Sequence, residues 1–356
     1  MRIVTAMSGG VDSSVATALL KQEGHDVIGL TMQLWPQADE KTGGCCGIDA
    51  IEDARRVAYK LGIPHYVTDL RDIFSAEIIS DFCREYGRGR TPNPCVLCNN
   101  RIKFGALLDK ARELDADFIA TGHYARLERD AASGAMLLKK GIDATKDQSY
   151  FLCRLTREQL EHALFPVGHL TKRQARDIAA ELELPVADRP ESQEICFIPD
   201  DDYAGFLARY SGGTAVPGPI LDGEGRILGE HRGITAYTVG QRRGLGIAAP
   251  NPLYVTAIDA ARNAVIVGDK EQTYGTELVA GELNWLLPDE PAFPLAAEAK
   301  VRYRAAAADA TVENIDSSNV YVKFNKPQMA ITPGQTIAFY HGDTVIGGGI
   351  IEKQGR

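Results

Sequence analysis

A glycine-rich turn between a strand and a helix opens the chain and constrains its fold more than any other segment. Residues 3–7 predict a buried strand, Ser-Gly-Gly-Val-Asp-Ser follows at 8–13, and a helical pattern continues to Gln22. The glycines allow a tight turn that brings backbone close to a phosphate, and free N–H groups at a helix start bind anions. We expect Asp12 or Ser13 to cap this helix. The segment therefore predicts a phosphate-binding loop in an α/β fold.

The residue types in this loop indicate the chemistry it serves. No lysine follows the glycines, whereas a Walker A loop needs one to reach the β- and γ-phosphates. This argues against γ-phosphoryl transfer and fits a loop that holds pyrophosphate while AMP is attached to an acceptor. A Gly-Gly pair alone would be an ordinary turn, but the complete string resembles the loop of the N-type ATP pyrophosphatases. The resemblance implies adenylation of an acceptor that the loop does not identify.

Length, charge and cysteine content narrow the classes of protein. A length of 356 residues predicts two or three domains, and the net charge of -9 gives no overall attraction to nucleic acid. A local basic patch would still bind RNA. Neither a signal pattern nor an apolar run of membrane-spanning length is visible, so we expect a cytoplasmic protein without a membrane partner. We also expect a monomer. Seven cysteines in such a chain indicate catalysis, metal binding or burial rather than structural disulfides.

Strand and helix signals alternate up to about residue 200, which predicts a doubly wound, mainly parallel α/β sheet. Ligands bind such sheets at the carboxyl ends of strands, where the 8–13 loop, Met32 and Gly122 fall. We expect strands at 3–7, 26–32, 65–67 and 117–121, and helices at 14–22, 49–61 and 101–114.

Beyond about Tyr210 the chain is rich in glycine, proline and short alternating strands, which predicts smaller β domains. Strands are expected at 254–258, 264–267, 299–304, 319–324 and 336–340. We therefore expect a nucleotide-binding catalytic domain at 1–204, a central β-rich domain at 205–273 and a C-terminal β-barrel at 274–356.

A C-x-x-C pair, Cys95 and Cys98, follows two prolines. We expect Asn99 or Asn100 to cap a helix that begins near Arg101, which would place Cys98 at a helix N-terminus and lower its thiol pKa. Three interpretations remain open: a buried structural pair, half of a zinc site, or a redox or sulfur-handling pair. The chain has no second C-x-x-C, which weakens the zinc interpretation.

Another cysteine, Cys196, stands between Ile195 and Phe197. Taken alone it is more typical of a core residue than of a catalyst. Its distance along the chain from the C-x-x-C pair leaves a partner role open. We expect Cys83 and Cys153 to be packing residues, and we assign no role to Cys45 and Cys46.

Three further segments combine polar and aromatic residues. In Lys146–Leu152, Asp147 either caps a helix or contacts a polar substrate. After Gly122, which would let a nucleotide approach the backbone, His123 is either a phosphate contact or a buried side chain. Residues 233–247 and a set of cationic and aromatic residues predict a surface for RNA, or else solvated strand faces. That set is Lys300, Arg302, Tyr303, Arg304, Lys323 and Lys326.

Together these segments resemble the tRNA-specific 2-thiouridylases, which place sulfur on C2 of the wobble uridine, U34. The resemblance covers nearly the whole chain and implies an adenine nucleotide alpha-hydrolase-like, PP-loop fold that uses ATP with Mg²⁺. The matching motifs are 8–14, 89–94, Cys98-Asn99, 122–124, 146–150, 192–197, 238–242, 332–335 and 347–349.

The resemblance also implies roles for single residues. Cys98 and Cys196 would be catalytic, with Cys196 carrying a persulfide from a sulfur-relay protein or a cysteine desulfurase and Cys98 closing a disulfide with it. ATP contacts would fall on Ala6, Met7, Ser8, Gly9, Gly10, Val11, Asp12, Ser13, Met32 and Gly122. Contacts to tRNA would fall on Asn93, Pro94, Cys95, Lys146, Asp147, Gln148, Arg302 and Tyr303.

Cys95 departs from the pattern, because many family members carry Asp at this position. A C-x-x-C pair with a third, distant cysteine resembles instead the pattern of a thiolase subgroup that is proposed to hold a 4Fe–4S cluster. Cys95, Cys98 and Cys196 would then ligate three irons and leave one iron open to bind sulfide. A small-molecule adenylating synthetase is a further hypothesis, but it leaves the cysteines and the β domains unexplained. A non-enzymatic RNA-binding protein leaves the ATP loop unexplained.

Overall fold

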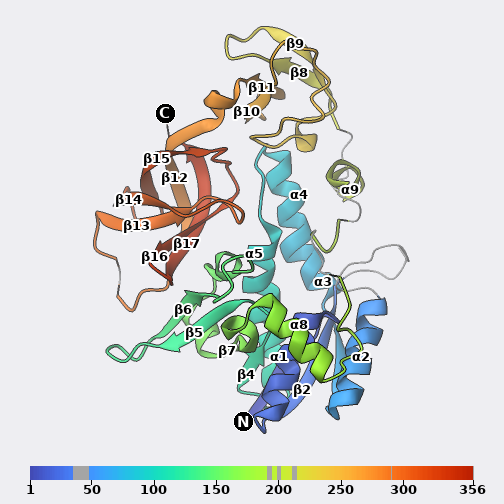
Figure 1. Ribbon diagram of the computed structural model, residues 1–356. Helices are drawn as coiled ribbons and strands as arrows, with labels where there is room; N and C mark the ends of the chain where they lie inside the picture. Colours follow the sequence, from blue (N-terminus) through green and yellow to red (C-terminus); the bar gives the residue numbers. More distant parts are fainter. Residues whose placement is uncertain (35–47, 191–194, 199–201, 211–214, 290, 356) are drawn as a thin grey trace.

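The computed structural model describes residues 1–34, 48–190, 195–198, 202–210, 215–289 and 291–355. The expectations for Cys45 and Cys46, and the 192–194 part of the motif before Cys196, lie outside these residues. Within them the strands form sheets of five, four and eight strands. Figure 1 shows the five-stranded sheet with its helices at one end of the molecule and the two β regions at the other.

The N-terminal sheet is parallel throughout, with strand order β3-β2-β1-β4-β7. Its strands are buried by helices on both faces, so apolar residues point both ways along β1. Ile3 packs with α1, α2 and α8, whereas Val4 packs with the helices on the opposite face. The predicted doubly wound α/β fold is confirmed. The strands are β1 (Arg2–Ala6), β2 (Asp26–Gln33), β3 (His65–Asp69), β4 (Phe118–Ala120) and β7 (Ala163–Leu164), and the helices named are α1 (Val11–Gln22), α2 (Ile48–Leu61) and α8 (Lys172–Glu181).

Two long helical runs cover the opposite face. The first comprises α3 (Arg71–Phe74), η1 (Ser75–Ile79) and α4 (Ser80–Gly87), and the second comprises α5 (Pro94–Cys98), η2 (Asn99–Ala106) and α6 (Leu107–Arg112). Shorter helices η3 (Ser149–Leu152), α7 (Arg157–Glu161), η4 (Pro166–His169) and α9 (Tyr203–Tyr210) follow.

The second run corrects the expected helix start near Arg101. The helix begins at Pro94, because a proline at the first helical position lacks only an N–H that would be unpaired there. The side chains of Asn99 and Asn100 do not cap it; they donate to the carbonyls of Phe151 and Arg154 at 3.1 and 2.8 Å. Cys95 therefore lies in the first turn of the helix, the position that we expected for Cys98.

The central region is a four-stranded sheet in the order β10-β11-β8-β9. Ile220, Val255 and Val265 are buried in its core. The strands are β8 (Gly218–Leu221), β9 (Ile227–His231), β10 (Tyr254–Asp259) and β11 (Ala264–Gly268), with short helices η6 (Ile234–Ala236) and η7 (Lys270–Thr273).

The C-terminal region is a closed six-stranded barrel in the order β12-β15-β14-β13-β16-β17, because β12 also pairs with β17. The predicted barrel is confirmed. A hairpin from the N-terminal region, β5 (Ala125–Arg129) and β6 (Met136–Lys140), extends the same sheet where Lys139 pairs with Thr344. The barrel strands are β12 (Tyr274–Trp285), β13 (Leu295–Lys300), β14 (Ala308–Asn314), β15 (Val320–Met329), β16 (Thr336–His341) and β17 (Thr344–Gln354).

One predicted barrel strand is wrong in its second half. The strand expected at 299–304 ends at Lys300, and the chain then turns, closed by the Ala305 N–H donating to the carbonyl of Arg302 at 3.1 Å. After Lys300, only Val301 of the residues up to 304 is buried in the barrel core, so the alternation of polar and apolar residues does not continue as a ladder. Arg302 and Tyr303 consequently lie on a turn. Among the described residues, no helix combines the length and apolar character needed to cross a membrane.

Candidate active site

A cleft of about 1540 Å³ lies where the N-terminal sheet, the central region and the barrel meet. It is lined by the carboxyl ends of β1 and β2, the start of α5, and the turn after β13. The residues that the family resemblance assigned to ATP, tRNA or catalysis all line this cleft except Gly9. Of the wider cationic set predicted to face RNA, Lys323 and Lys326 lie elsewhere, exposed on β15. The sequence predictions scattered over the chain are thus brought to one site.

The phosphate loop is held by its own serines. The Ser8 N–H donates to Ser13 Oγ at 3.2 Å, and Ser13 Oγ lies 3.2 Å from the carbonyl of Gly10, to which it donates. The residue that precedes α1 is Gly10, and no side chain caps the helix. The expectation that Asp12 or Ser13 caps it was therefore wrong. A helix start without a side-chain cap leaves its N–H groups for a ligand.

Two glycines bring neighbouring segments against this loop. Gly9 has a φ of +69°, and a Cβ there would lie 2.3 Å from the carbonyl oxygen of Ala50. A Cβ on Gly122, after β4, would lie 2.6 Å from backbone atoms of Asp12 and Ser13. The close approach of β4 to the start of α1 thus requires glycine at 122.

Asp12 faces a cation that sequence reasoning missed. Lys172 Nζ, at the start of α8, donates to both carboxylate oxygens of Asp12 at 2.7 and 2.8 Å, and Tyr124 Oη donates to one of them at 2.7 Å. The Lys172 side chain is only 11% exposed. No local pattern marks this pair, because its members are far apart in sequence.

Arg189 is a second missed cation. Its Nη1 donates to the carbonyl of Gly9 at 3.0 Å and also binds the carboxylate of Asp53. Both Arg189 and Lys172 line the cleft. Each of these cations is paired with a carboxylate beside the loop, Lys172 with Asp12 and Arg189 with Asp53.

His123 is a buried side chain rather than a cation. Its Nδ1 lies 2.7 Å from Thr121 Oγ1, and its ring packs between Phe104 and Phe165. Burial, and to a smaller extent Lys103, lowers the pKa of His123 well below its ordinary value. The imidazole is neutral at neutral pH, which favours the buried-side-chain interpretation over a charged phosphate contact.

Cys95, Cys98 and Cys196 all line the cleft. Cys98 is buried in the N-terminal core, and Cys196 packs against that core from outside. The neighbouring Phe197 ring anchors the Cys196 segment by edge contacts with Phe74 and Phe82 at centroid distances of 5.6 and 5.4 Å. Among the described residues, no group of three His, Cys, Asp or Glu side chains is placed to hold a metal ion.

The two cysteines assigned to packing lie outside the cleft. Cys153 is fully buried, and burial raises the pKa of its thiol to about 12. Cys83 packs against the N-terminal core, and burial also raises the pKa of its thiol. Their packing roles are confirmed.

Asp147 and Gln148 organise one wall of the cleft. Asp147 Oδ1 accepts the N–H groups of Gly141 and Ser149 at 3.0 and 3.1 Å, so it pairs the first N–H of η3, although the cap position itself is Gln148 and carries no side-chain cap. Gln148 Oε1 accepts the Tyr124 N–H at 3.0 Å. This wall therefore connects to the Tyr124 that contacts Asp12.

The turn after β13 lines the cleft next to this wall. The Tyr303 ring lies 4.4 Å from that of Phe151, and Lys300 Nζ lies 5.4 Å from the Tyr303 ring centre. Burial lowers the pKa of Lys300. Cationic side chains gather in the cleft although the chain as a whole is acidic; they are Lys103, Lys140, Lys146, Lys172, Arg189, Lys300, Arg302 and Arg304.

A phosphate loop at the edge of a parallel sheet, with cysteines and cationic side chains in the same cleft, defines the class as a nucleotide-dependent enzyme. Family models match three successive segments. Residues 1–200 match a tRNA methyl transferase HUP domain, 204–269 a tRNA methyl transferase PRC-barrel domain, and 275–351 an aminomethyltransferase β-barrel domain. The chain belongs to the family of the tRNA-specific 2-thiouridylases, as its relatives show.

Relatives named tRNA-specific 2-thiouridylase MnmA align over almost the full chain. Identity is 52% over 357 residues with MnmA 2 of Thermoanaerobacter sp. (strain X514), covering 99% of this chain and 98% of the relative. It is 53% over 355 residues with MnmA of Heliobacterium modesticaldum, covering 99% and 92%. A solved 4-thiouridine synthetase–RNA complex with bound ATP covers 55% of this chain and 44% of its own at 15% identity and a TM-score of 0.34. Membership of the family rests on the sequence relatives and the family models.

Proposed function

We propose that the protein is an ATP-dependent tRNA-uridine 2-sulfurtransferase that replaces the C2 oxygen of wobble uridine U34 with sulfur. The observation that carries the proposal is the single cleft, in which the phosphate loop, the three cysteines and the cationic walls converge. Relatives that are 50–53% identical to this chain over 99% of its length are named tRNA-specific 2-thiouridylase. We propose that the reaction takes place in the cytoplasm, where ATP and tRNA are available.

In the first step the uridine becomes adenylated. The uridine O2 attacks the α-phosphorus of ATP, and pyrophosphate leaves from the loop at Ser8–Ser13. Ala6, Met7, Met32 and Gly122 contact the nucleotide. Mg²⁺ would enter with ATP, bound mainly through phosphate oxygens, because the described residues offer no three-ligand protein site. Lys172 and Arg189 stand beside the loop and stabilise the departing pyrophosphate.

In the second step sulfur replaces oxygen. The terminal sulfur of a Cys196 persulfide attacks C2 and loses its proton, and AMP departs with the former O2. The Cys98 thiolate then attacks Cys196 Sγ, which forms a Cys98–Cys196 disulfide and leaves the sulfur on C2 as a thiocarbonyl. A dithiol reductant restores both thiols. A sulfur-relay protein or a cysteine desulfurase supplies the next persulfide sulfur.

The tRNA is bound across the domain junction. The target base is splayed out of the anticodon loop, as enzymes that modify bases require. Asn93, Pro94 and Cys95 at the start of α5 then lie near the base. Lys146, Asp147 and Gln148 contact the tRNA from one wall, and Arg302 and Tyr303 contact it from the other. We assign these walls to a catalytic domain at 1–204 and a barrel at 274–356, joined by a central domain at 205–273, in a monomeric enzyme.

The cluster hypothesis has no support in the geometry. The three candidate ligands Cys95, Cys98 and Cys196 line the same cleft, but they are not arranged as a metal-binding group among the described residues. We therefore derive no step through a cluster. A small-molecule synthetase would leave the cationic wall on the barrel without a purpose.

Nucleoside analysis of tRNA tests the proposal. The wild-type enzyme, with ATP, Mg²⁺ and a persulfide donor, is expected to form 2-thiouridine in a tRNA with U34. Cys98→Ser and Cys196→Ser each abolish the product, whereas Cys83→Ser, which lies outside the cleft, retains it. Retained thiolation in either of the first two variants would contradict the assignment.

A further inference from the structure

The segment that leads into helix α5 is the meeting point of all three regions. At Gly89, where φ is +71°, a Cβ would lie 2.8 Å from a side-chain carbon of Ile258 on β10. Thr91 Oγ1 lies 3.4 Å from Thr238 Oγ1 in the central region. Thr91 N–H donates to the carbonyl of Pro333 in the barrel at 2.9 Å. This segment ends at Pro94, where the helix that carries Cys95 and Cys98 begins.

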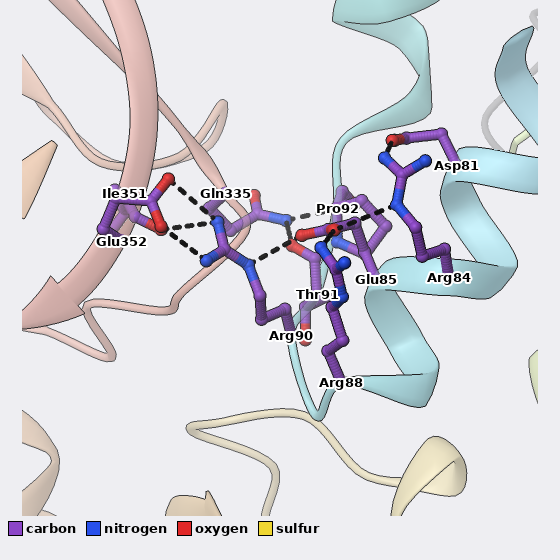
Figure 2. Close-up of polar contacts among 10 residues, drawn as sticks. All are labelled: Asp81, Arg84, Glu85, Arg88, Arg90, Thr91, Pro92, Gln335, Ile351 and Glu352. Atoms are coloured by element: carbon purple, nitrogen blue, oxygen red, sulfur yellow. Dashed lines mark hydrogen bonds and ion pairs between the residues drawn. The ribbon is translucent and has the colours of Figure 1, made fainter. Parts of the chain in front are cut away.

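Arg90 makes the strongest of these contacts. Its guanidinium donates to both carboxylate oxygens of Glu352 on β17, at 2.6 and 3.2 Å (Figure 2). Its Nε lies 2.6 Å from Glu85 Oε2 on α4, an ion contact whose N–H is not aimed at the oxygen. The side chains of Arg90 and Glu85 are only 20% and 12% exposed. A bidentate arginine–carboxylate pair that is largely shielded from solvent fixes the relative position of its two segments better than an exposed pair does.

A second barrel residue holds the backbone that follows Arg90. Gln335 Nε2 donates to the carbonyl of Thr91 at 2.8 Å and to that of Pro92 at 3.3 Å (Figure 2). Gly334 packs so closely that a Cβ there would lie 3.0 Å from Thr91 N. The barrel thus binds the peptide carbonyls of Thr91 and Pro92, just before helix α5.

We propose that Arg90, held between Glu85 and Glu352, is a positioning residue that sets where helix α5 lies relative to the barrel. The inference rests on the proposed function, in which the cysteines on α5 and the tRNA contacts on the barrel act on one base. Because Arg302 and Tyr303 belong to the barrel, movement of the barrel relative to α5 displaces the bound base from Cys98. A displacement of about 1 Å lowers catalytic rate by about 100-fold.

Glu352→Gln tests the role, since it keeps the size of the side chain and removes its charge. Asp343→Asn is the matched control, because Asp343 also joins the barrel to the N-terminal region through a 2.7 Å contact with Arg126 but does not touch the 90–94 segment. The partner arginines are similarly buried, at 20% and 18% exposure. Neither carboxylate lines the cleft.

Two readouts are measured. In Glu352→Gln, kcat for 2-thiouridine formation falls about 10- to 100-fold while the KM for ATP stays within about twofold. Arg90→Lys keeps the charge but not the bidentate contact with Glu352, and its kcat is expected to fall as well. Amide hydrogen exchange of the peptide containing Thr91 to Cys98 becomes faster in both variants. Asp343→Asn changes neither readout.

Equal kcat in Glu352→Gln and Asp343→Asn, or full kcat in Arg90→Lys, would overturn the proposal. If Glu352→Gln fails to fold, Gln335→Met is used instead, because it removes the hydrogen bonds to the carbonyls of Thr91 and Pro92. It is expected to lower kcat and to speed amide exchange in the same way. Unaltered exchange and kcat in Gln335→Met would overturn the proposal. The exchange readout does not depend on the reaction. A wild-type enzyme that forms no 2-thiouridine would therefore refute the proposed function, while the exchange rates still decide whether Arg90 holds the segment.

Discussion

Lys172 Nζ at the start of α8 binds both carboxylate oxygens of Asp12 in the first turn of α1, at 2.7 and 2.8 Å. The pair ties α8 to the 8–13 loop, and under the proposed function it keeps a cation beside the phosphates of ATP. Without Lys172, the Asp12 carboxylate would face a triphosphate with its charge unbalanced. The loop lacks the lysine of a Walker A sequence, and α8 provides a cation from elsewhere in the fold.

Lys172→Met is expected to raise the KM for ATP about tenfold and to lower stability by about 1.5–3 kcal/mol, the range for a hydrogen bond to a charged group. Pyrophosphate release at varied ATP concentrations measures the first effect, and thermal unfolding the second. Lys60→Met is the control, since Lys60 makes a surface contact with Glu183 away from the cleft. An unchanged KM in Lys172→Met would show that the cation does not serve the nucleotide.

Gly122→Ala is expected to abolish ATP binding. Its Cβ would lie 2.6 Å from the backbone of Asp12 and Ser13, so the start of α1 must shift. Gly87→Ala is the matched substitution, because a Cβ there meets nothing within 4 Å. Isothermal titration with ATP compares the two, and wild-type affinity in Gly122→Ala would contradict the close packing described.

Sequence reasoning succeeded where the signal was local. The strand, the glycines and the helix of the 8–13 loop are adjacent in the chain, so their pattern predicts the fold class, which is confirmed; the ATP contacts assigned to this loop stay a prediction. It failed where distant residues decide. Lys172 and Arg189 reach the loop only through the fold, and nothing in their neighbourhood marks them.

Two local errors have the same origin. Asn99 and Asn100 have the chemistry of helix caps, but carbonyls at Phe151 and Arg154 bind their amides inside the folded protein. Residues 299–304 alternate like a strand, yet the chain turns after Lys300 and places Arg302 in the cleft. In both cases tertiary contacts overrode local propensity.

Acidification is expected to destabilise the protein partly through His123. Its pKa is lowered in the folded state by burial, whereas in the unfolded chain it is about 6.5. Below that pH the unfolded state binds the extra proton, so stability falls as pH falls, by up to about 1.4 kcal/mol per pH unit.

His123→Gln should therefore show a smaller drop in melting temperature than wild type between about pH 7.5 and pH 5.5. Some dependence will remain, because burial also lowers the pKa of His65. An equally steep drop in both proteins would contradict a neutral, buried His123.

Cys153 is expected to resist alkylation in the folded enzyme. Its side chain is fully buried and its pKa is raised to about 12, so the reactive thiolate is scarce at about pH 8. Iodoacetamide labelling followed by peptide mass spectrometry should modify Cys153 only after unfolding in urea. Rapid labelling of the native protein would show that this part of the core opens readily.

The central claim is that ATP activates the C2 oxygen of a tRNA uridine, and an oxygen-18 label follows that atom directly. A tRNA carrying oxygen-18 at O2 of U34 is converted with ATP and a persulfide donor, and the AMP is analysed by mass spectrometry. We predict that one labelled oxygen appears in AMP for each 2-thiouridine formed. Thiolated tRNA accompanied by unlabelled AMP would contradict adenylation of the uridine.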